Sequence, residues 1–271
     1  TPCINSRIYP VNKLTAVVAA MRTEGIPVER ALRGTGISPQ ELNSPTSKMS
    51  VSQLLTAYRN ALEFSRDQYF AVRLGLNVKV TTYGIYGYAM LSSPTQRALI
   101  ELALKYNRLM AATADLSFRE EPKGEIGVWT IEPLANRSTE QRLYRFLVEI
   151  YLGTILALSS DILEKPERIR KDIRLVYPHS PDLPAYEEFF GCPVLFGQDR
   201  NELRINTSWL DVPTRCSNEL TFSTVQMYST VIWFAPTKPV RSVQRLSGMT
   251  RVAPLRSVKS VSAQMVLHCT S

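Results

Sequence analysis

The sequence has few of the residues that hold metal ions. Among 271 residues there are two histidines and four cysteines. The cysteines (Cys3, Cys192, Cys216 and Cys269) lie far apart and form no C-x-x-C pair. A structural zinc site needs clustered Cys and His ligands, so we expect no bound metal. Scattered cysteines in a chain of this length usually remain reduced thiols, which fits the reducing environment of a cytoplasm.

Long apolar runs are also missing. A membrane-spanning helix needs about 20 apolar residues, whereas the longest candidate run, residues 146–158, is interrupted by Glu149 and carries Gly153 and Thr154. Residues 1–7 show no basic stretch followed by an apolar core, so no secretory signal is expected. The composition, 44% hydrophobic and 21% charged, is typical of a folded globular chain. We therefore expect a cytoplasmic protein.

The sequence motifs of several common enzyme classes are absent. There is no G-x-S-x-G, no H-E-x-x-H, no P-loop and no G-x-G-x-x-G. Two histidines also offer few general bases. This argues against an enzyme, although catalytic sites built from carboxylates leave no such signature. We expect a binding protein without a cofactor.

Acidic residues are missing from the C-terminal part. No Asp or Glu follows Glu219, and residues 228–271 hold six of the basic residues. The first 227 residues contain 26 basic and 24 acidic residues, so the net charge of +8 belongs mostly to the end of the chain. The body is nearly neutral and offers no sign of a face that binds polyanions.

The first part of the chain shows helical spacing of its apolar residues. Helices are predicted over residues 11–24, 28–34, 38–42, 50–65, 69–76 and 94–111. Ser38 with Glu41, Ser50, and the pair Ser92 and Ser93 suit the positions that cap helix N-termini.

The pattern then changes to alternation with period two. Residues 115–120 and 126–131 predict a β-hairpin around the turn 122–124. A long helix follows over 139–163, then a strand at 173–178, a short helix at 184–190, and a second hairpin that joins 194–197 to 202–206. The expected class is α+β: a helical layer, then about four mainly antiparallel strands packed against one long helix. We divide the chain into a domain over 1–222, helical to 112 and α+β from 113, and a basic tail over 223–271.

The order of several short motifs resembles a known family. They are GISPQEL at 36–42, YGIYGYAMLSSPT at 83–95, VYPH at 176–179, YEEFFGCPV at 186–194 and NEL at 201–203. With the long helix between them, they resemble the arabinose-binding-like ligand-binding region of AraC/XylS-type transcription regulators, of the kind that controls ornithine and arginine utilisation. The resemblance covers residues 10–222.

This resemblance implies a function. In such regulators the N-terminal region binds a small effector and dimerises, and a C-terminal pair of helix-turn-helix units binds DNA. The segment after Leu220 is shorter than that pair, so a complete DNA-binding module is not expected.

The tail nevertheless holds a short stretch that is similar to a helix-turn-helix. Gly248 would lie in the turn, and Arg245, Thr250 and Arg251 would contact DNA. Pro254 falls inside the would-be second helix, which it would disrupt. A basic tail without this fold and direct DNA binding through the tail therefore remain alternatives.

Three tyrosines spaced by glycines form the clearest candidate for an effector site. Tyr83, Tyr86 and Tyr88 alternate with Gly84 and Gly87. Glycine allows close approach of the backbone, and tyrosine offers a ring and a hydroxyl. The segment is either one wall of an effector pocket or a tight connection packed in the core.

Residues from neighbouring elements are expected to face the same pocket. Tyr106, Asn107 and Met110 end the helix before the first hairpin, and Trp129 lies on its second strand. Pockets form preferentially between a sheet and its covering helices. The effector is an amino acid by analogy with the family, or an apolar metabolite by the aromatic lining.

Two charged residues of the long helix allow two interpretations. Arg145 and Glu149 are four positions apart, so they either pair with each other on the surface or face inward and bind a zwitterionic effector. His179, in the loop after a strand, is either an exposed or capping residue or the ligand of a haem-based sensor.

Overall fold

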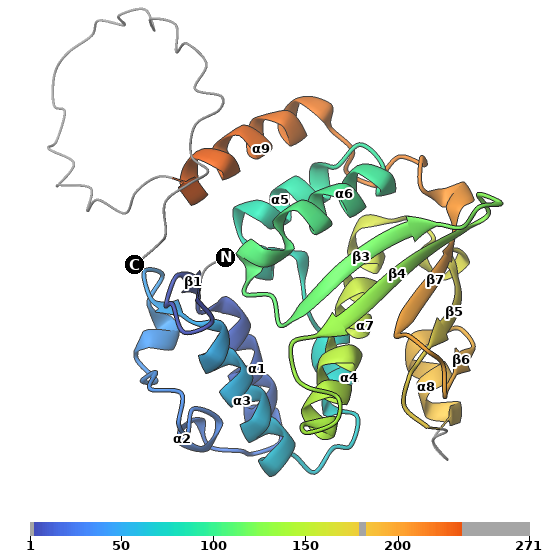
Figure 1. Cartoon of the computed structure of the whole chain (residues 1–271). Helices are drawn as coiled ribbons and strands as arrows, with labels where there is room; N and C mark the ends of the chain where they lie inside the picture. Colours follow the sequence, from blue (N-terminus) through green and yellow to red (C-terminus); the bar gives the residue numbers. More distant parts are fainter. Residues whose placement is uncertain (1–2, 179–182, 235–271) are drawn as a thin grey trace, which may run out of the picture. The chain divides into compact units, whose positions relative to one another are not determined.

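The computed structural model describes residues 3–178 and 183–234 of the chain. Its first layer is helical and holds α1 (Asn12–Thr23), α2 (Val28–Ala31), α3 (Val51–Phe64) and α4 (Phe70–Leu76). A short antiparallel ribbon, β1 (Tyr9–Pro10) with β2 (Lys48–Met49), ties the beginning of the chain to the start of α3. Figure 1 shows this layer beside a sheet and a long helix, which confirms the α+β class.

Helix α3 begins where its sequence predicts. The Gln53 backbone N–H donates to Ser50 Oγ at 3.1 Å, and the Ser50 backbone N–H donates to Gln53 Oε1 at 2.9 Å. This reciprocal pair satisfies two of the backbone donors that a helix N-terminus leaves free. Leu54 and Tyr58 lie on its buried face, so both the cap and the apolar stripe of this helix are confirmed.

A similar cap at Ser38 supports only one turn. Ser38 and Glu41 exchange the expected bonds, with the Ser38 N–H donating to Glu41 Oε2 at 2.8 Å. The helix predicted over 38–42 is instead a single 3-10 turn, η1 (Glu41–Asn43). Pro45 explains the early stop, because a proline disfavours helical backbone at the preceding residue, and Ser44 is extended (φ −97°, ψ 122°).

The tyrosine-glycine segment forms structure that the sequence did not predict. A 3-10 turn, η2 (Val80–Tyr83), leads into helix α5 (Ile85–Ser92). Gly84 begins the helix with φ of +56°, and a β-carbon on Gly87 would lie 2.1 Å from the carbonyl oxygen of Val80. Both glycines are therefore required by the backbone itself.

The helix predicted over 94–111 is shorter and has a different cap. It becomes α6 (Gln96–Tyr106), followed by the 3-10 turn η3 (Asn107–Met110). Thr95 caps α6 by accepting from the Ala98 N–H at 3.2 Å. The cap predicted at Ser92 and Ser93 is wrong, because both hydroxyls donate back to carbonyls of α5, at 2.8 and 2.9 Å.

The first predicted hairpin is confirmed and forms one side of a larger sheet. Strands β3 (Ala114–Glu120) and β4 (Ile126–Pro133) pair antiparallel with Phe118 opposite Trp129. The sheet continues with β7 (Glu202–Asn206), β5 (Arg170–Arg174) and β6 (Val194–Leu195), in the order β3-β4-β7-β5-β6. It thus has five strands among the described residues, where about four were predicted, and β5 begins three residues before the predicted strand.

The second predicted hairpin is wrong. Strand β6 pairs parallel with β5, and β7 lies between β4 and β5, antiparallel to both. Asn201, just before β7, fixes this topology. Its side chain accepts from the Val176 N–H at 3.2 Å and donates to Tyr144 Oη at 2.8 Å, and its carbonyl accepts from the Ile131 N–H at 3.0 Å.

Helix α7 (Gln141–Ile162) is the central helix of the fold. It crosses α4 at the distance of backbone contact: a β-carbon on Gly75 would lie 2.5 Å from the Ile150 oxygen, and one on Gly153 2.8 Å from the Val72 oxygen. In the described part of the chain, α7 alone is long and apolar enough to cross a membrane, and 56% of that apolar stretch is buried by the protein. We interpret α7 as a core helix.

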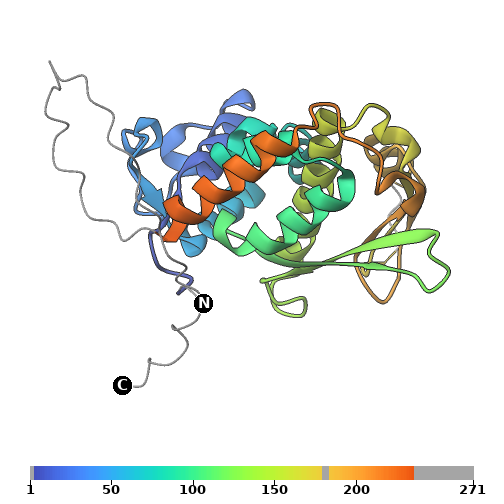
Figure 2. The same cartoon turned by 90° about the horizontal axis from the view of Figure 1, so that it is seen from above.

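The last described elements are two helices. Helix α8 (Leu183–Phe190) packs beside the sheet, and α9 (Glu219–Phe234) continues past residue 222, where we placed a boundary. Helix α9 lies against α5, as Figures 1 and 2 both show. His179 and the three proposed DNA contacts lie outside the described residues: Arg245, Thr250 and Arg251.

Candidate functional site

A cavity lies between the sheet and the helices that cover it. Its lining comes from α1, η2, α5, α6 and η3, from strands β3 and β4, and from α7. The space that the centre of a water molecule can occupy there is about 90 Å³, and the cavity is partly open to solvent. The position matches the general preference of ligand sites for the space between a sheet and its helices.

Aromatic rings form much of the cavity wall. The Tyr83 and Tyr86 rings meet edge to face with centroids 6.1 Å apart, and Trp129 meets Phe118 at 5.4 Å. The Tyr86 hydroxyl donates to the Leu102 carbonyl at 3.1 Å, so Tyr86 offers the cavity its ring and not its hydroxyl. These pairs give the wall a fixed, mostly apolar shape.

Two side chains of the cavity lining form hydrogen bonds with the backbone at the beginning of strand β3. Asn107 Nδ2 donates to the Ala114 carbonyl at 3.0 Å. Tyr151 Oη, on α7, accepts from the backbone N–H groups of Thr113 and Ala114 at 3.0 and 3.3 Å. These bonds of Asn107 Nδ2 and Tyr151 Oη hold η3, β3 and α7 together beside the cavity.

One cationic side chain reaches the cavity. Lys13, on α1, is partly buried, and its Nζ lies 5.6 Å from the centroid of the Tyr83 ring. Desolvation lowers the pKa of Lys13 to about 8. Within the described residues, Lys13 makes no hydrogen bond and no ion pair, and no Asp or Glu lines the cavity.

A second polar side chain in the cavity is buried and unsatisfied. Gln96, in the first turn of α6, is 4% exposed, and its Oε1 has no hydrogen-bond partner among the described residues. A buried polar group without a partner costs about 1–3 kcal/mol. A group that the protein leaves unpaired at this cost is suited to a partner that binds from outside.

The cavity continues into a neighbouring hollow beside the helical layer. The two spaces share Lys13, Tyr83, Tyr151 and Thr154, and the second extends toward Tyr58 on α3. Burial raises the pKa of Tyr58, Tyr83 and Tyr151, so these hydroxyls stay neutral at ordinary pH. Lys13 therefore stands where the helical layer, η2 and α7 meet.

The structure brings together five of the nine residues that the sequence suggested for an effector site. Four do not line the cavity. Tyr106 packs behind its wall, edge to face with Tyr86 at 5.7 Å, and Tyr88 is 64% exposed. The other two, Arg145 and Glu149, lie elsewhere on α7. The five in the lining are Tyr83, Tyr86, Asn107, Met110 and Trp129.

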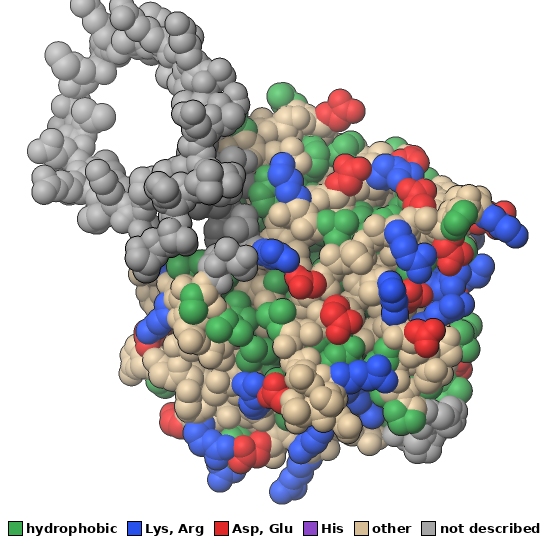
Figure 3. Space-filling model, viewed as in Figure 1, with side chains coloured by type: hydrophobic (Ala, Val, Ile, Leu, Met, Phe, Trp, Pro, Cys, Tyr) green, Lys and Arg blue, Asp and Glu red, His purple; other side chains and the backbone are tan. Residues whose placement is uncertain are grey.

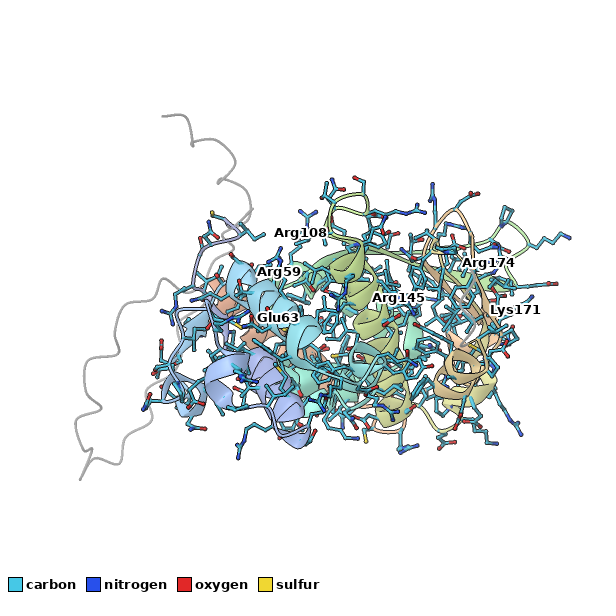
Figure 4. The ribbon with its side chains drawn as sticks, turned by 90° about the horizontal axis from the view of Figure 1, so that it is seen from below. Arg59, Glu63, Arg108, Arg145, Lys171 and Arg174 are labelled. Atoms are coloured by element: carbon cyan, nitrogen blue, oxygen red, sulfur yellow. The ribbon has the colours of Figure 1, made fainter. Side chains whose placement is uncertain are left out.

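Arg145 and Glu149 pair with each other at the edge of a separate, open hollow between α3, α4 and α7. Arg145 Nε donates to Glu149 Oε1 at 2.7 Å, and the Tyr186 hydroxyl donates to the same oxygen at 2.5 Å. Arg145 also lies over the rings of Tyr177 and Tyr186. Figure 4 shows Arg145 on α7, between α3 and the sheet. Burial raises the pKa of Glu149 although Arg145 opposes the shift. The charges of Arg145 and Glu149 therefore neutralise each other within this ion pair.

Sequence reasoning missed Lys13 and Gln96. Lys13 borders an apolar helix face that contains Leu14, Val17 and Met21, but a lysine in this position gave no signal that α1 reaches a cavity. Gln96 follows the cap Thr95 and gave no signal, because glutamine is common on exposed helix surfaces.

The described residues offer no metal site, and one face of the molecule shows no charged patch. No group of three or more His, Cys, Asp or Glu side chains is placed there to hold a metal ion. On the face drawn in Figure 3, basic and acidic side chains are interspersed, so no patch of one sign forms on that face. The cavity is the strongest candidate for a functional site.

Comparison with known proteins gives consistent matches. The sequence profile of a family described as "Arabinose-binding domain of AraC transcription regulator, N-term" matches residues 25–214. The ornithine utilization regulator of Pseudomonas aeruginosa is 24% identical over 225 residues, which cover 82% of this chain and 63% of that protein. An uncharacterised helix-turn-helix transcriptional regulator of Mycobacterium tuberculosis is 26% identical over 113 residues, 41% of this chain and 33% of its own length.

A solved structure has the same fold. The crystal structure of the transcriptional regulator CdpR from Pseudomonas aeruginosa superposes with a TM-score of 0.60 at 18% identity. The match covers 81% of this chain and 62% of that one. The chain thus spans less than two thirds of the length of the ornithine utilization regulator and of CdpR.

Proposed function

Because the chain belongs to the family of arabinose-binding domains of AraC transcription regulators, we propose that it senses a small effector in the cytoplasm and controls transcription through dimerisation and DNA binding. The family and its relatives are transcription regulators and not enzymes. The observation that carries the proposal is the cavity between α5, α6, α7 and the hairpin β3–β4.

The effector occupies this cavity in our proposal. Tyr83, Tyr86 and Trp129 supply rings, Met110 an adaptable apolar side chain, and Asn107 a fixed part of the floor. We do not include Tyr88, Arg145 or Glu149, since they lie outside the cavity.

Helix α5 is the element through which occupancy is reported. It lines the cavity with Tyr86 and Met90, and it also packs against α9. An effector that binds better to one packing of α5 shifts the population toward that packing and thereby moves α9. Hydrogen exchange of α9 backbone amides, with and without effector, measures this coupling.

Dimerisation has a candidate surface on the same two helices. Tyr88 on α5 is 64% exposed, and Leu220 and Met227 on α9 are 80% and 59% exposed. Exposed large apolar side chains on adjoining elements are typical of protein interfaces. A second copy of this chain is the occupant that the family suggests.

The dimer is tested by sedimentation. The double substitution Tyr88→Glu and Leu220→Glu should convert a dimer into a monomer, because it places charges in an apolar interface. Leu134→Glu, at an exposed leucine (48%) after β4, is the matched control and should leave the dimer intact. A dimer that survives the double substitution would place the interface elsewhere.

Effector binding is tested by thermal stabilisation against amino acids, polyamines, sugars and carboxylic acids. A ligand at a hundred times its dissociation constant adds about 2.7 kcal/mol of stability. Ala103→Phe, which fills the cavity from α6, should abolish the effect, whereas Leu134→Ala, at an exposed position after β4, should not. Stabilisation by a ligand that persists in Ala103→Phe would contradict the cavity as its site.

A further inference from the structure

The cavity carries one charge, and that charge has no partner in the described part of the protein. Lys13 Nζ faces the Tyr83 ring and makes neither an ion pair nor a hydrogen bond there. We propose that the effector is an amphipathic carboxylic acid. This inference rests on the proposed function, in which the cavity is the effector site. Its carboxylate pairs with Lys13, and its apolar body lies among the rings and aliphatic side chains of the cavity.

The lining disfavours the amino acids that the similarity to an ornithine utilization regulator suggests. A zwitterion or a diamine brings an ammonium group that needs a carboxylate or several acceptors when it is desolvated. No Asp or Glu lines the cavity. Glu149, which could have bound the ammonium group of a zwitterion, lies outside the cavity and accepts hydrogen bonds from Arg145 and Tyr186. A single negative charge matches what the cavity offers.

The lining also disfavours sugars. A sugar needs many hydrogen-bonding groups, but three hydroxyls of the wall are already engaged by the backbone of the protein. The Tyr86 hydroxyl donates to the backbone of α6, the Ser159 hydroxyl donates to the Ile155 carbonyl at 2.7 Å, and Tyr151 accepts two backbone N–H groups. What remains for the body of the ligand is apolar, with leucine, isoleucine and methionine side chains between the rings.

Gln96 adds a second point of recognition. Its buried amide carries an oxygen without a partner, and it lines the same cavity from α6 while Lys13 enters from α1. An amide can accept a hydrogen bond from a hydroxyl of the ligand. We therefore expect a hydroxylated carboxylic acid to bind more tightly than the plain acid of the same length.

Binding should depend on pH through Lys13. With its pKa near 8, Lys13 is about 90% protonated at pH 7 and about 10% protonated at pH 9. The titratable groups that line the two joined hollows with it are Tyr58 from α3, Tyr83 from η2, Tyr86 from α5 and Tyr151 from α7, and burial raises the pKa of all four. They stay neutral, so affinity for a carboxylate should fall about tenfold between these pH values.

The test is calorimetric titration of the whole chain with n-alkanoates of six to fourteen carbons, below their micelle concentrations, and with the matching n-alkanols. We expect one saturable site, an optimal chain length, and binding at least tenfold weaker for the alcohol than for the acid. Lys13→Met should reduce acid affinity to the level of the alcohol and remove the pH dependence. Lys171→Met, an exposed lysine on β5, is the charge-matched control and should change neither.

The outcomes separate this inference from the proposed function. Equal affinity for acid and alcohol, or acid binding unchanged in Lys13→Met, would overturn the carboxylate while leaving the cavity as a ligand site. Binding of an amino acid or sugar that Ala103→Phe abolishes would also overturn it and support the cavity. If no compound of any class binds, the proposed function fails, and this inference fails with it. Acid binding that persists in Ala103→Phe is association with the surface and contradicts both.

Discussion

Replacing Lys13 by methionine should stabilise the ligand-free protein at neutral pH while it removes carboxylate binding. Methionine keeps an apolar stem of similar length but removes a charge that is desolvated and unpaired. The pKa of Lys13 falls from 10.5 to about 8, and each pKa unit corresponds to about 1.4 kcal/mol. The full shift would amount to about 3 kcal/mol, but Lys13 is partly exposed to solvent, so we expect a gain of about 1 kcal/mol.

The gain should disappear at high pH. The pKa of Lys13 is lower in the folded state than in the unfolded state, so the unfolded state binds more protons between about pH 8 and 10.5. The cost of the charge is present in full below pH 8, and stability recovers as pH rises through that window. Lys13→Met has no such cost at any pH. The difference between the two proteins is therefore largest near pH 7 and small near pH 10.

Thermal unfolding at pH 7 and pH 10 tests both the expected gain in stability and its disappearance at high pH. A change of 1 kcal/mol moves the melting temperature by about 2–4 °C in a protein of this size. Lys171→Met should shift it by less than a degree at either pH. The reasoning is refuted if Lys13→Met melts lower than the parent at pH 7, or if its gain persists unchanged at pH 10.

Three further substitutions probe the packing around the cavity. Gly153→Ala should destabilise by about 1–3 kcal/mol in chemical denaturation, because its β-carbon would lie 2.8 Å from a backbone oxygen of α4; an unchanged midpoint would disprove the close crossing. Tyr86→Phe should cost about 1 kcal/mol of stability, since it loses one hydrogen bond to the α6 backbone, and effector affinity by calorimetry should stay within twofold. Arg145→Met should cost about 1–3 kcal/mol at pH 7, because the buried Glu149 carboxylate loses its counter-charge and keeps only the Tyr186 hydroxyl. Its loss should shrink as pH falls, because the pKa of Glu149 is already raised and protonation removes the charge; an equal loss at pH 5 and pH 8 would argue against an ionised Glu149.

Local signals predicted the parts of the fold that depend on neighbouring residues. The cap at Ser50, the apolar stripe of α3, the hairpin around residues 122–124 and the long helix α7 were all predicted by spacing within a few turns or one hairpin. The class α+β followed from their order. The pairing of β7 between β4 and β5 did not, because it depends on the buried hydrogen bonds of Asn201 with residues 25 to 70 positions away.

The cavity was predictable in part for the same reason. Tyr83, Tyr86, Asn107, Met110 and Trp129 come from elements that follow one another in the sequence, and they do line one space. Lys13 comes from the first helix, and nothing local indicates that α1 reaches a cavity built mostly by residues 83–159. Of the two interpretations of Arg145 and Glu149, the structure shows the mutual pairing, while their third partner, Tyr186 on α8, lies 37 positions beyond Glu149.

Helix α5 has consequences for how this protein can be used as well as for how it works. It is one helix thick, about 10 Å, and it separates the cavity from α9. Met227 on α9 is 59% exposed, so a fluorescent dye attached there through an introduced cysteine would lie on the outer side of the helices that border the proposed effector site. With Cys3, Cys216 and Cys269 replaced first, a change in dye emission on addition of the effector that we propose would report its binding without DNA.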